Sequence, residues 1–405
     1  MNLRTQHEIS CAATYPSTLH TGIARNDAFS FWKLSENWRE ALEPIIDDSE
    51  KEAEHFLYER YLTDQNRRPP ASLGTYYRLR GLIPDELRFR INAIAIRARK
   101  RRQFPNWPCE PALIEQRLRW LHQSLGRVGA TDGWHIGFWP RHHRCCIVLT
   151  HDVESAAGLR LMKAVANIEE KHGFRSAWNL PLMQYPIDWN EIEELRHRGF
   201  EFGAHGLRHD GRLFRSLKDF AGLAPQIESL AQEHQLAGFR APSTLRRAEW
   251  IAAMSFDFDS SFADTDPWEP QPGGTCSPFP FYLGSMVELP YTMPQDHTLL
   301  HLLHSDPLNV WMLKARWISS FGGMILTLTH PDYIGSYPYL SRYDELLGQL
   351  ATFRATWRAL PSQVAAWWRL RSALTLRTDG DDVVIEGRHA DQASALRLSE
   401  APLFQ

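Results

Sequence analysis

The chain has 405 residues, with 45 basic and 48 acidic side chains and a formal net charge of −3 at pH 7. Its length allows one large domain with attachments or two to three domains. The near-neutral balance excludes a globally basic nucleic-acid coat and an acidic disordered tail, so we expect no nucleic-acid partner. Five cysteines without a CxxC pair argue against a disulfide framework or a Cys-based zinc site. Because we see no signal peptide and no apolar stretch of about 20 residues, we expect a cytoplasmic protein.

Residues 1–138 are irregular, aromatic and charge-rich, and we expect a partly helical N-terminal extension. Pro84 and the two acidic residues after it predict the start of a helix over 85–102. Its apolar face carries Leu87, Ile91 and Ile94, and its end is strongly basic. Such a helix can contact an anionic membrane surface. The alternative is a helix that packs on the main domain and leaves its basic end in water.

Residues 139–360 alternate short apolar runs with amphipathic stretches, which predicts βαβ units and parallel strands. The expected strands are 145–150, 175–178, 200–204, 238–240, 256–259, 286–289 and 324–329. The expected helices are 155–172, 189–198, 217–234, 245–254, 308–319 and 342–357. About seven such units suit an α/β barrel. Residues 361–405 are expected to form a helix and short strands around a turn at 378–381.

Ionisable residues stand where these strands are expected to end. In a parallel α/β barrel the active groups lie at the carboxyl ends of the strands, so the residues there are candidates for one shared site. In chain order they are His151, Asp152, Glu154, His205, His209, Arg240, Asp257, Asp259, Glu288 and His330.

His205 and His209 form an H-x3-H pair. On a helical turn, residues four apart face the same way and can reach one ion, and two histidines with a carboxylate are a common catalytic zinc set. Asp152 and Glu154, two apart in an extended chain, share one face, so one can bind the metal while the other takes a proton from water. The alternatives are two solvated histidines and an aspartate that caps the next helix.

Arg240 and His330 complete the candidate set. The guanidinium of Arg240 can hold a carboxylate through paired donors. His330 can act as a general acid, because an unperturbed histidine titrates near neutral pH. The alternatives are a surface ion pair for Arg240 and a hydrogen-bonded loop histidine for His330.

In order and spacing, five segments resemble the motifs of the polysaccharide deacetylase family, also called the NodB-homology or carbohydrate esterase family 4 domain. They are Leu-Thr-His-Asp-Val-Glu at 149–154, His-Gly-Leu-Arg-His at 205–209, Arg-Ala-Pro at 240–242, Phe-Asp-Phe-Asp-Ser-Ser at 256–261 and Leu-Thr-His at 328–330. The resemblance covers about residues 139–360. It implies a distorted (β/α)7-type barrel, a divalent metal, usually Zn²⁺, and removal of acyl groups from N-acyl sugars.

The resemblance also implies a role for each matched residue. Asp152 matches the catalytic base, and Arg240 the residue that orients it. His330 matches the general acid, which Asp257 or Asp259 would orient. The metal ligands are Glu154, His205 and His209. Two positions depart from the family pattern: Glu154 stands where aspartate is usual, and Gly206 where serine or threonine commonly follows the first histidine.

We therefore expect a metal-dependent hydrolase that removes an acetyl or formyl group from an N-acylated sugar of a glycan, glycolipid or sugar conjugate. The absence of an export signal favours a lipid-linked or nucleotide-linked sugar. The basic helix 85–102 would then provide peripheral contact with the membrane. Two alternatives stay open. One is an inactive relative that binds a metal or a glycan, and the other is a hydrolase of a small non-sugar amide.

Overall fold

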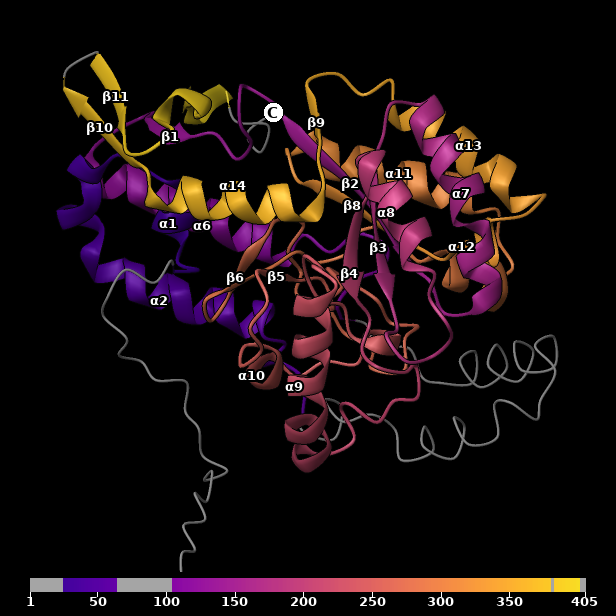
Figure 1. Ribbon diagram of the computed structural model, residues 1–405. Coiled ribbons are helices and arrows are strands. Elements are labelled where there is room, and N and C mark those ends of the chain that lie inside the picture. Colours follow the sequence, from indigo (N-terminus) through magenta and orange to yellow (C-terminus); the bar gives the residue numbers. More distant parts are fainter. Residues whose placement is uncertain (1–24, 64–103, 380–381, 401–405) are drawn as a thin grey trace, which may run out of the picture.

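The computed structural model describes residues 25–63, 104–379 and 382–400, and its centre is a parallel sheet (Figure 1). The strand order is β4-β3-β2-β8, with β9 beside the first half of β2. All eight residues of β2 are buried, as expected for an apolar strand covered on both faces. The bounds are β2 (Cys145–Asp152), β3 (Ser176–Leu180), β4 (Glu201–Ala204), β8 (Met324–Thr329) and β9 (Thr356–Arg358).

The parallel sheet closes into a barrel through shorter contacts. Ala204 at the end of β4 bridges to Phe239, and Phe239 bridges to Asp259 in β5 (Phe258–Asp259). Strand β5 pairs with β7 (Met286–Glu288), and β6 (Phe281–Leu283) lies antiparallel to β7. Beyond β7, the backbone N–H groups of Thr292 and Met293 both donate to the Leu326 carbonyl in β8. The predicted distorted (β/α)7-type barrel is therefore confirmed.

Helices cover the barrel, and several begin at the residue that their sequence indicates. Ser155, Asp188, Ser216 and Asp306 each cap the helix that follows by accepting a backbone N–H. The helices are α7 (Ala156–Lys171), α8 (Trp189–His197), α9 (Leu217–Glu233), α10 (Ala248–Ile251), α11 (Pro307–Ser320), α12 (Pro331–Ile334) and α13 (Tyr339–Leu350). The helix expected over 342–357 ends at Leu350, because residues 356–358 form strand β9 instead.

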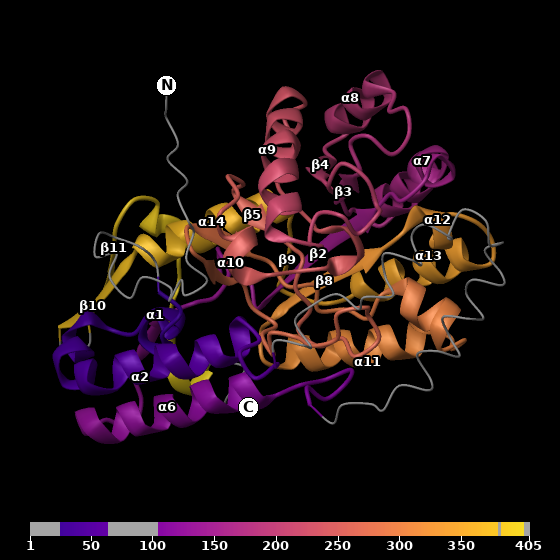
Figure 2. The same ribbon diagram turned by 90° about the horizontal axis from the view of Figure 1, so that it is seen from below.

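The segments outside the barrel pack together at one side of it (Figures 1 and 2). Arg371 joins them, because its guanidinium donates to the carbonyls of Phe31, Ile136 and Gly137. The N-terminal elements are α1 (Ala28–Trp32), α2 (Arg39–Leu57), α6 (Ala112–Val128) and β1 (Trp134–Ile136). The C-terminal elements are α14 (Pro361–Ala373), β10 (Thr375–Asp379), β11 (Asp382–Glu386) and β12 (Ala395–Arg397), which pairs with β1.

The predicted basic helix at 85–102 lies outside the described residues. Within the parts of the chain that the structure describes, no helix has the length and apolar character needed to cross a membrane.

Candidate metal centre

Glu154, His205 and His209 come together at the carboxyl ends of β2 and β4. Their candidate ligand atoms all lie within 4.8 Å of one another. Nε2 of His209 lies 2.9 Å from Oε1 of Glu154. The H-x3-H pair lies on a loop and not on the helical turn that its spacing suggested, because Gly206 has a φ of +73° and turns the chain directly after His205. The loop still brings both rings together, with centroids 5.4 Å apart.

The state of His205 fits a metal ligand. Its Nδ1 lies 3.0 Å from the Arg240 carbonyl oxygen, an acceptor that requires the proton to be on Nδ1. Its Nε2 is buried and finds no hydrogen-bond partner in the described chain. Burial lowers the pKa of His205 to about 4, so the ring is neutral at pH 7. A buried lone pair beside a second histidine and a carboxylate suits a divalent cation such as zinc.

Asp152, the last residue of β2, is held as a carboxylate beside this group. Its Oδ1 accepts from Nδ2 of Asn179 at 2.9 Å and from Nη1 of Arg240 at 3.1 Å, and its Oδ2 lies 3.7 Å from Nε2 of His205. Burial alone would raise the pKa of Asp152, but the opposing effect of His205 and Arg240 is larger, so the pKa is lowered. The carboxylate is therefore ionised. Its Oδ1 already accepts two hydrogen bonds, so Oδ2 is the atom positioned to accept a proton.

Arg240 is itself fully buried and fixed by the strands around it. Its Nε and Nη2 donate to the backbone carbonyl and the hydroxyl of Ser260, both at 2.7 Å. Its Nη1 donates to Oγ1 of Thr150 at 2.8 Å as well as to Asp152. The arginine is thus rigidly positioned, and it leaves Asp152 little freedom to rotate.

His330 follows β8 and is paired with Asp296. Its Nδ1 lies 2.7 Å from Oδ1 of Asp296, and its backbone N–H donates to Oδ2 at 2.7 Å. Its Nε2 lies 3.9 Å from Oε1 of Glu154. Burial lowers the pKa of His330, but Asp296 and the other carboxylates more than offset this and raise it to about 10. The ring is therefore a cation whose Nε2–H faces the metal-ligand group.

The prediction that Asp257 or Asp259 orients His330 is wrong. Asp257 is exposed, and Asp259 is buried against Ser261, with its Oδ1 accepting from the hydroxyl at 2.7 Å. Asp259 also shares a hydrogen bond with Glu288, another residue at a predicted strand end. Asp259 and Glu288 thus pair with each other, and Asp296 takes the position beside His330.

His151 points away from the candidate centre. Its Nε2 lies 2.6 Å from Glu169 in α7, its Nδ1 lies 2.9 Å from Oγ1 of Thr329, and its ring stacks on Trp178. This explains why a histidine can lie next to Asp152 in the sequence without sharing its site, since neighbouring residues of a strand point to opposite faces.

Sequence reasoning missed Asn179 and Asp296. Asn179 lies one residue beyond the strand expected at 175–178, and β3 in fact runs to Leu180, so the rule of strand ends would have found it with the correct boundary. Asp296 is harder to find. The expected strand stops at residue 289, but the chain beyond it also hydrogen-bonds β8, through the N–H groups of Thr292 and Met293, and Asp296 follows this second contact.

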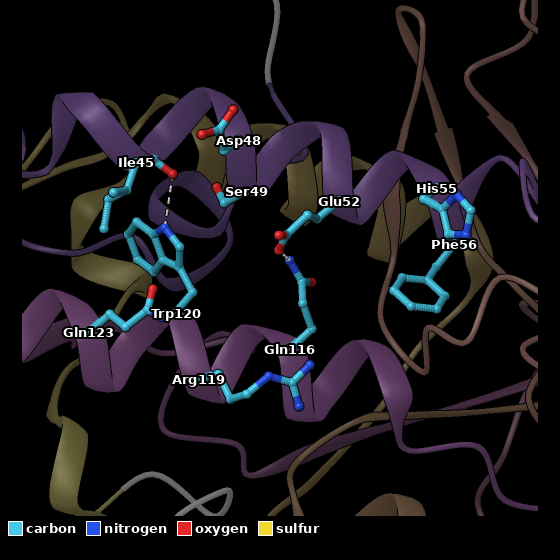
Figure 3. A pocket seen from close by; sticks show the side chains of 10 residues that line it. All are labelled: Ile45, Asp48, Ser49, Glu52, His55, Phe56, Gln116, Arg119, Trp120 and Gln123. Carbon is cyan, nitrogen blue, oxygen red and sulfur yellow. Dashed lines mark hydrogen bonds between the residues drawn. The ribbon is translucent and has the colours of Figure 1, made fainter.

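A separate hollow lies between α2 and α6, on the N-terminal side of the molecule (Figure 3). A hydrogen bond of 2.6 Å from Gln116 to Glu52 crosses it, and none of the metal-centre residues lines it. It therefore plays no part in the chemistry considered below.

No protein-family model matches the sequence, and no curated protein matches it. Solved structures do match. A chain named as a polysaccharide deacetylase from Mycobacterium smegmatis has 17% identity and a TM-score of 0.48, over 60% of this chain and 96% of its own. PuuE allantoinase has 11% identity and a TM-score of 0.47, over 57% and 92%. A chain named as a polysaccharide deacetylase from Pseudomonas aeruginosa PAO1 has 11% identity and a TM-score of 0.45, over 56% and 91%. Two of the three bear the name of the family that the sequence motifs resemble.

Proposed function

We propose that this protein is a metal-dependent hydrolase that removes an acyl group, acetyl or formyl, from the nitrogen of an N-acylated sugar. The observation that carries the proposal is one arrangement of side chains. Two buried histidines and a partly buried glutamate lie between an ionised aspartate and a cationic histidine. This is the set of groups that amide hydrolysis needs: a metal site, a base and an acid. The sequence motifs that resemble polysaccharide deacetylases support the choice of an N-acyl sugar.

Glu154, His205 and His209 would hold the metal, with zinc favoured by the two imidazoles. When bound, a divalent cation supplies Lewis acidity toward the acyl carbonyl and makes a nearby water easier to deprotonate.

Asp152 takes the proton of the attacking water, and its hydrogen bonds from Asn179 and Arg240 keep it charged and aimed until it does so. The C–N bond then breaks, and the leaving nitrogen needs a proton. His330 donates that proton from Nε2, because Nδ1 is engaged by Asp296. The resulting products are a free carboxylic acid and an amino sugar.

The proposal is tested by metal content and acyl release together. Purified protein should contain about one zinc per chain and should release acetate or formate from N-acylated oligosaccharides. The His205→Ala, His209→Ala double variant should lose both properties. A matched control removes two exposed helix histidines, His122→Ala and His197→Ala, and should keep both. Acyl release at the wild-type level from the His205, His209 double variant would refute the mechanism. Full zinc binding without release from any amide would instead favour an inactive metal-binding relative.

A further inference from the structure

Tyr333 lies beside the candidate metal centre, and the proposed mechanism does not use it. It belongs to α12, the short helix that begins directly after the proposed acid, His330. Its hydroxyl donates to Oε2 of Glu154 at 3.4 Å. The other carboxylate oxygen, Oε1, lies 2.9 Å from Nε2 of His209 and 3.9 Å from Nε2 of His330. The two oxygens of the metal-ligand glutamate therefore have different neighbours.

Three imidazole rings surround the ring of Tyr333. Its centroid lies 5.0 Å from that of His330, 5.6 Å from that of His297 and 4.8 Å from that of His301. The backbone N–H of Tyr333 also donates to the His330 carbonyl at 2.9 Å. These contacts restrict the orientation of the phenol, so its hydroxyl is held beside Glu154.

The same short helix also holds the backbone of Glu154. The Glu154 N–H donates to Oδ2 of Asp332, the residue before Tyr333, at 3.0 Å. Residue 154 is thus contacted both at its backbone and at one oxygen of its side chain. A glutamate has one rotatable bond more than an aspartate and loses more freedom when it is ordered. A second contact on the side chain therefore matters more here than it would for the family's aspartate.

A carboxylate can bind a cation through one oxygen or through both. Hydrogen bonds to a ligating carboxylate orient it and are a general feature of metal sites. The hydroxyl of Tyr333 is on Oε2, so it favours binding through Oε1, the oxygen that faces the histidines. A ligand that uses one oxygen leaves more room around the metal, and catalytic zinc sites keep one position open.

We propose that Tyr333 is a positioning residue, which holds Glu154 so that only Oε1 is directed to the metal position. The inference rests on the proposed function, since it takes Glu154, His205 and His209 to bind the metal. It also accounts for the departure from the family pattern at residue 154, because the tyrosine hydroxyl restrains the longer side chain.

Metal binding can be measured apart from turnover. Zinc-free protein is titrated with Zn²⁺ in competition with a chromophoric chelator. Tyr333→Phe removes the hydroxyl and keeps the ring, and it should bind zinc about three- to tenfold more weakly, the range for the loss of one hydrogen bond. Tyr337→Phe is the matched control, because Tyr337 is 86% exposed, and it should bind zinc as the wild type does.

Two further measurements separate positioning from a general structural effect. Co²⁺ bound in place of zinc reports its coordination number, because its visible absorption is more intense with four ligands than with five or six. In Tyr333→Phe the released Oε2 can bind as well, so the visible bands of the Co²⁺ form should weaken. In a Glu154→Ala background, Tyr333→Phe should weaken zinc binding no further, since the hydroxyl acts through Glu154.

Wild-type zinc affinity in Tyr333→Phe, or an equal further loss in the Glu154→Ala background, would overturn the inference. An unchanged Co²⁺ spectrum would overturn the assignment of a single oxygen. If the wild type binds no zinc, the inference and the proposed function fail together. If zinc affinity depends on Tyr333 through Glu154 but the wild type releases no acyl group, the inference stands and the proposed hydrolase does not. If the wild type is active and Tyr333→Phe keeps its zinc affinity, only the inference fails.

Discussion

Gly206→Ser restores the residue that the polysaccharide deacetylase motif commonly has after its first histidine, and we expect it to damage this protein. Gly206 separates the two histidines of the candidate metal centre and has a φ of +73°. Side chains with a Cβ disfavour that conformation. A Cβ at this position would also lie 2.8 Å from Cγ of Pro242, closer than real contacts of this kind. The chain is thus built here for glycine and not for the family's hydroxyl.

The size of the effect follows from these two observations. A non-glycine residue in the left-handed region costs about 1–2 kcal/mol, and the overlap with the Pro242 ring adds to that. If the loop relaxes in the absence of metal to relieve this strain, zinc binding must restore the strained conformation. Because each 1.4 kcal/mol is a factor of ten in affinity, we expect zinc to bind about 10- to 100-fold more weakly.

Competition with a chromophoric chelator gives the zinc dissociation constant of each variant. Gly222→Ala is the matched control, because Gly222 lies in α9 with no atom within 4 Å of the added Cβ, and it should leave zinc affinity unchanged while stabilising the helix by about 1 kcal/mol. If Gly206→Ser binds zinc as tightly as the wild type, the strain argument is refuted.

Three further predictions concern single carboxyl groups. Asp296→Asn should lower kcat on an N-acyl sugar by about 10²-fold, because His330 loses the anion that keeps it charged and oriented. An unchanged kcat would show that the His330–Asp296 pair is not the general acid. Glu154→Asp should lower activity by on the order of 10²-fold, since the carboxylate withdraws by about one methylene from His209, and a gain would show that the family's aspartate fits better. Burial raises the pKa of Glu201 to about 7 despite hydrogen bonds from Ser362. In the unfolded chain this carboxyl ionises near pH 4.5, so stability is full below that pH and falls as pH rises toward 7, by up to about 3 kcal/mol. Denaturant unfolding of Glu201→Gln should show a smaller fall between pH 5 and 8, and an identical pH profile would contradict the assignment.

The alternation of apolar runs with amphipathic stretches was enough to predict the barrel, because a buried parallel strand appears in the sequence as a continuous apolar run. The run at 145–150 has no exposed position, so its apolar and β-branched residues continue without alternation. The rule that active groups follow such strands then selected Asp152, His205 and His330, which the structure places around one centre. These assignments depend on local sequence and on the topology that parallel strands impose.

The predictions that failed depend on contacts that no local pattern encodes. Asp259 ends β5, as expected, but Asp257 precedes β5 and is exposed, and Asp259 pairs with Ser261 and Glu288 instead of His330. Asp296 reaches His330 because the chain beyond Pro290 hydrogen-bonds Leu326 in β8, a residue about 30 positions away in the sequence. The conformation of Gly206 was equally hidden, since glycine is compatible with both a helical turn and the loop that forms.

Glu154 is the position where the sequence departs most from the family pattern. Its backbone is held by the segment that follows β8. The backbone N–H of Glu154 donates to Oδ2 of Asp332 at 3.0 Å, and the next residue, Ser155, hydrogen-bonds the other oxygen. Asp332 has room to do so because residue 158 is glycine, where any Cβ would collide with its carboxylate. The proposed acid, His330, lies two residues before Asp332, so one short segment fixes both the acid and the backbone of the metal-ligand residue. Because these hydrogen bonds fix the backbone of residue 154, the chain cannot easily shift to bring a shorter side chain up to His209. We therefore expect no compensation elsewhere for the methylene lost in Glu154→Asp.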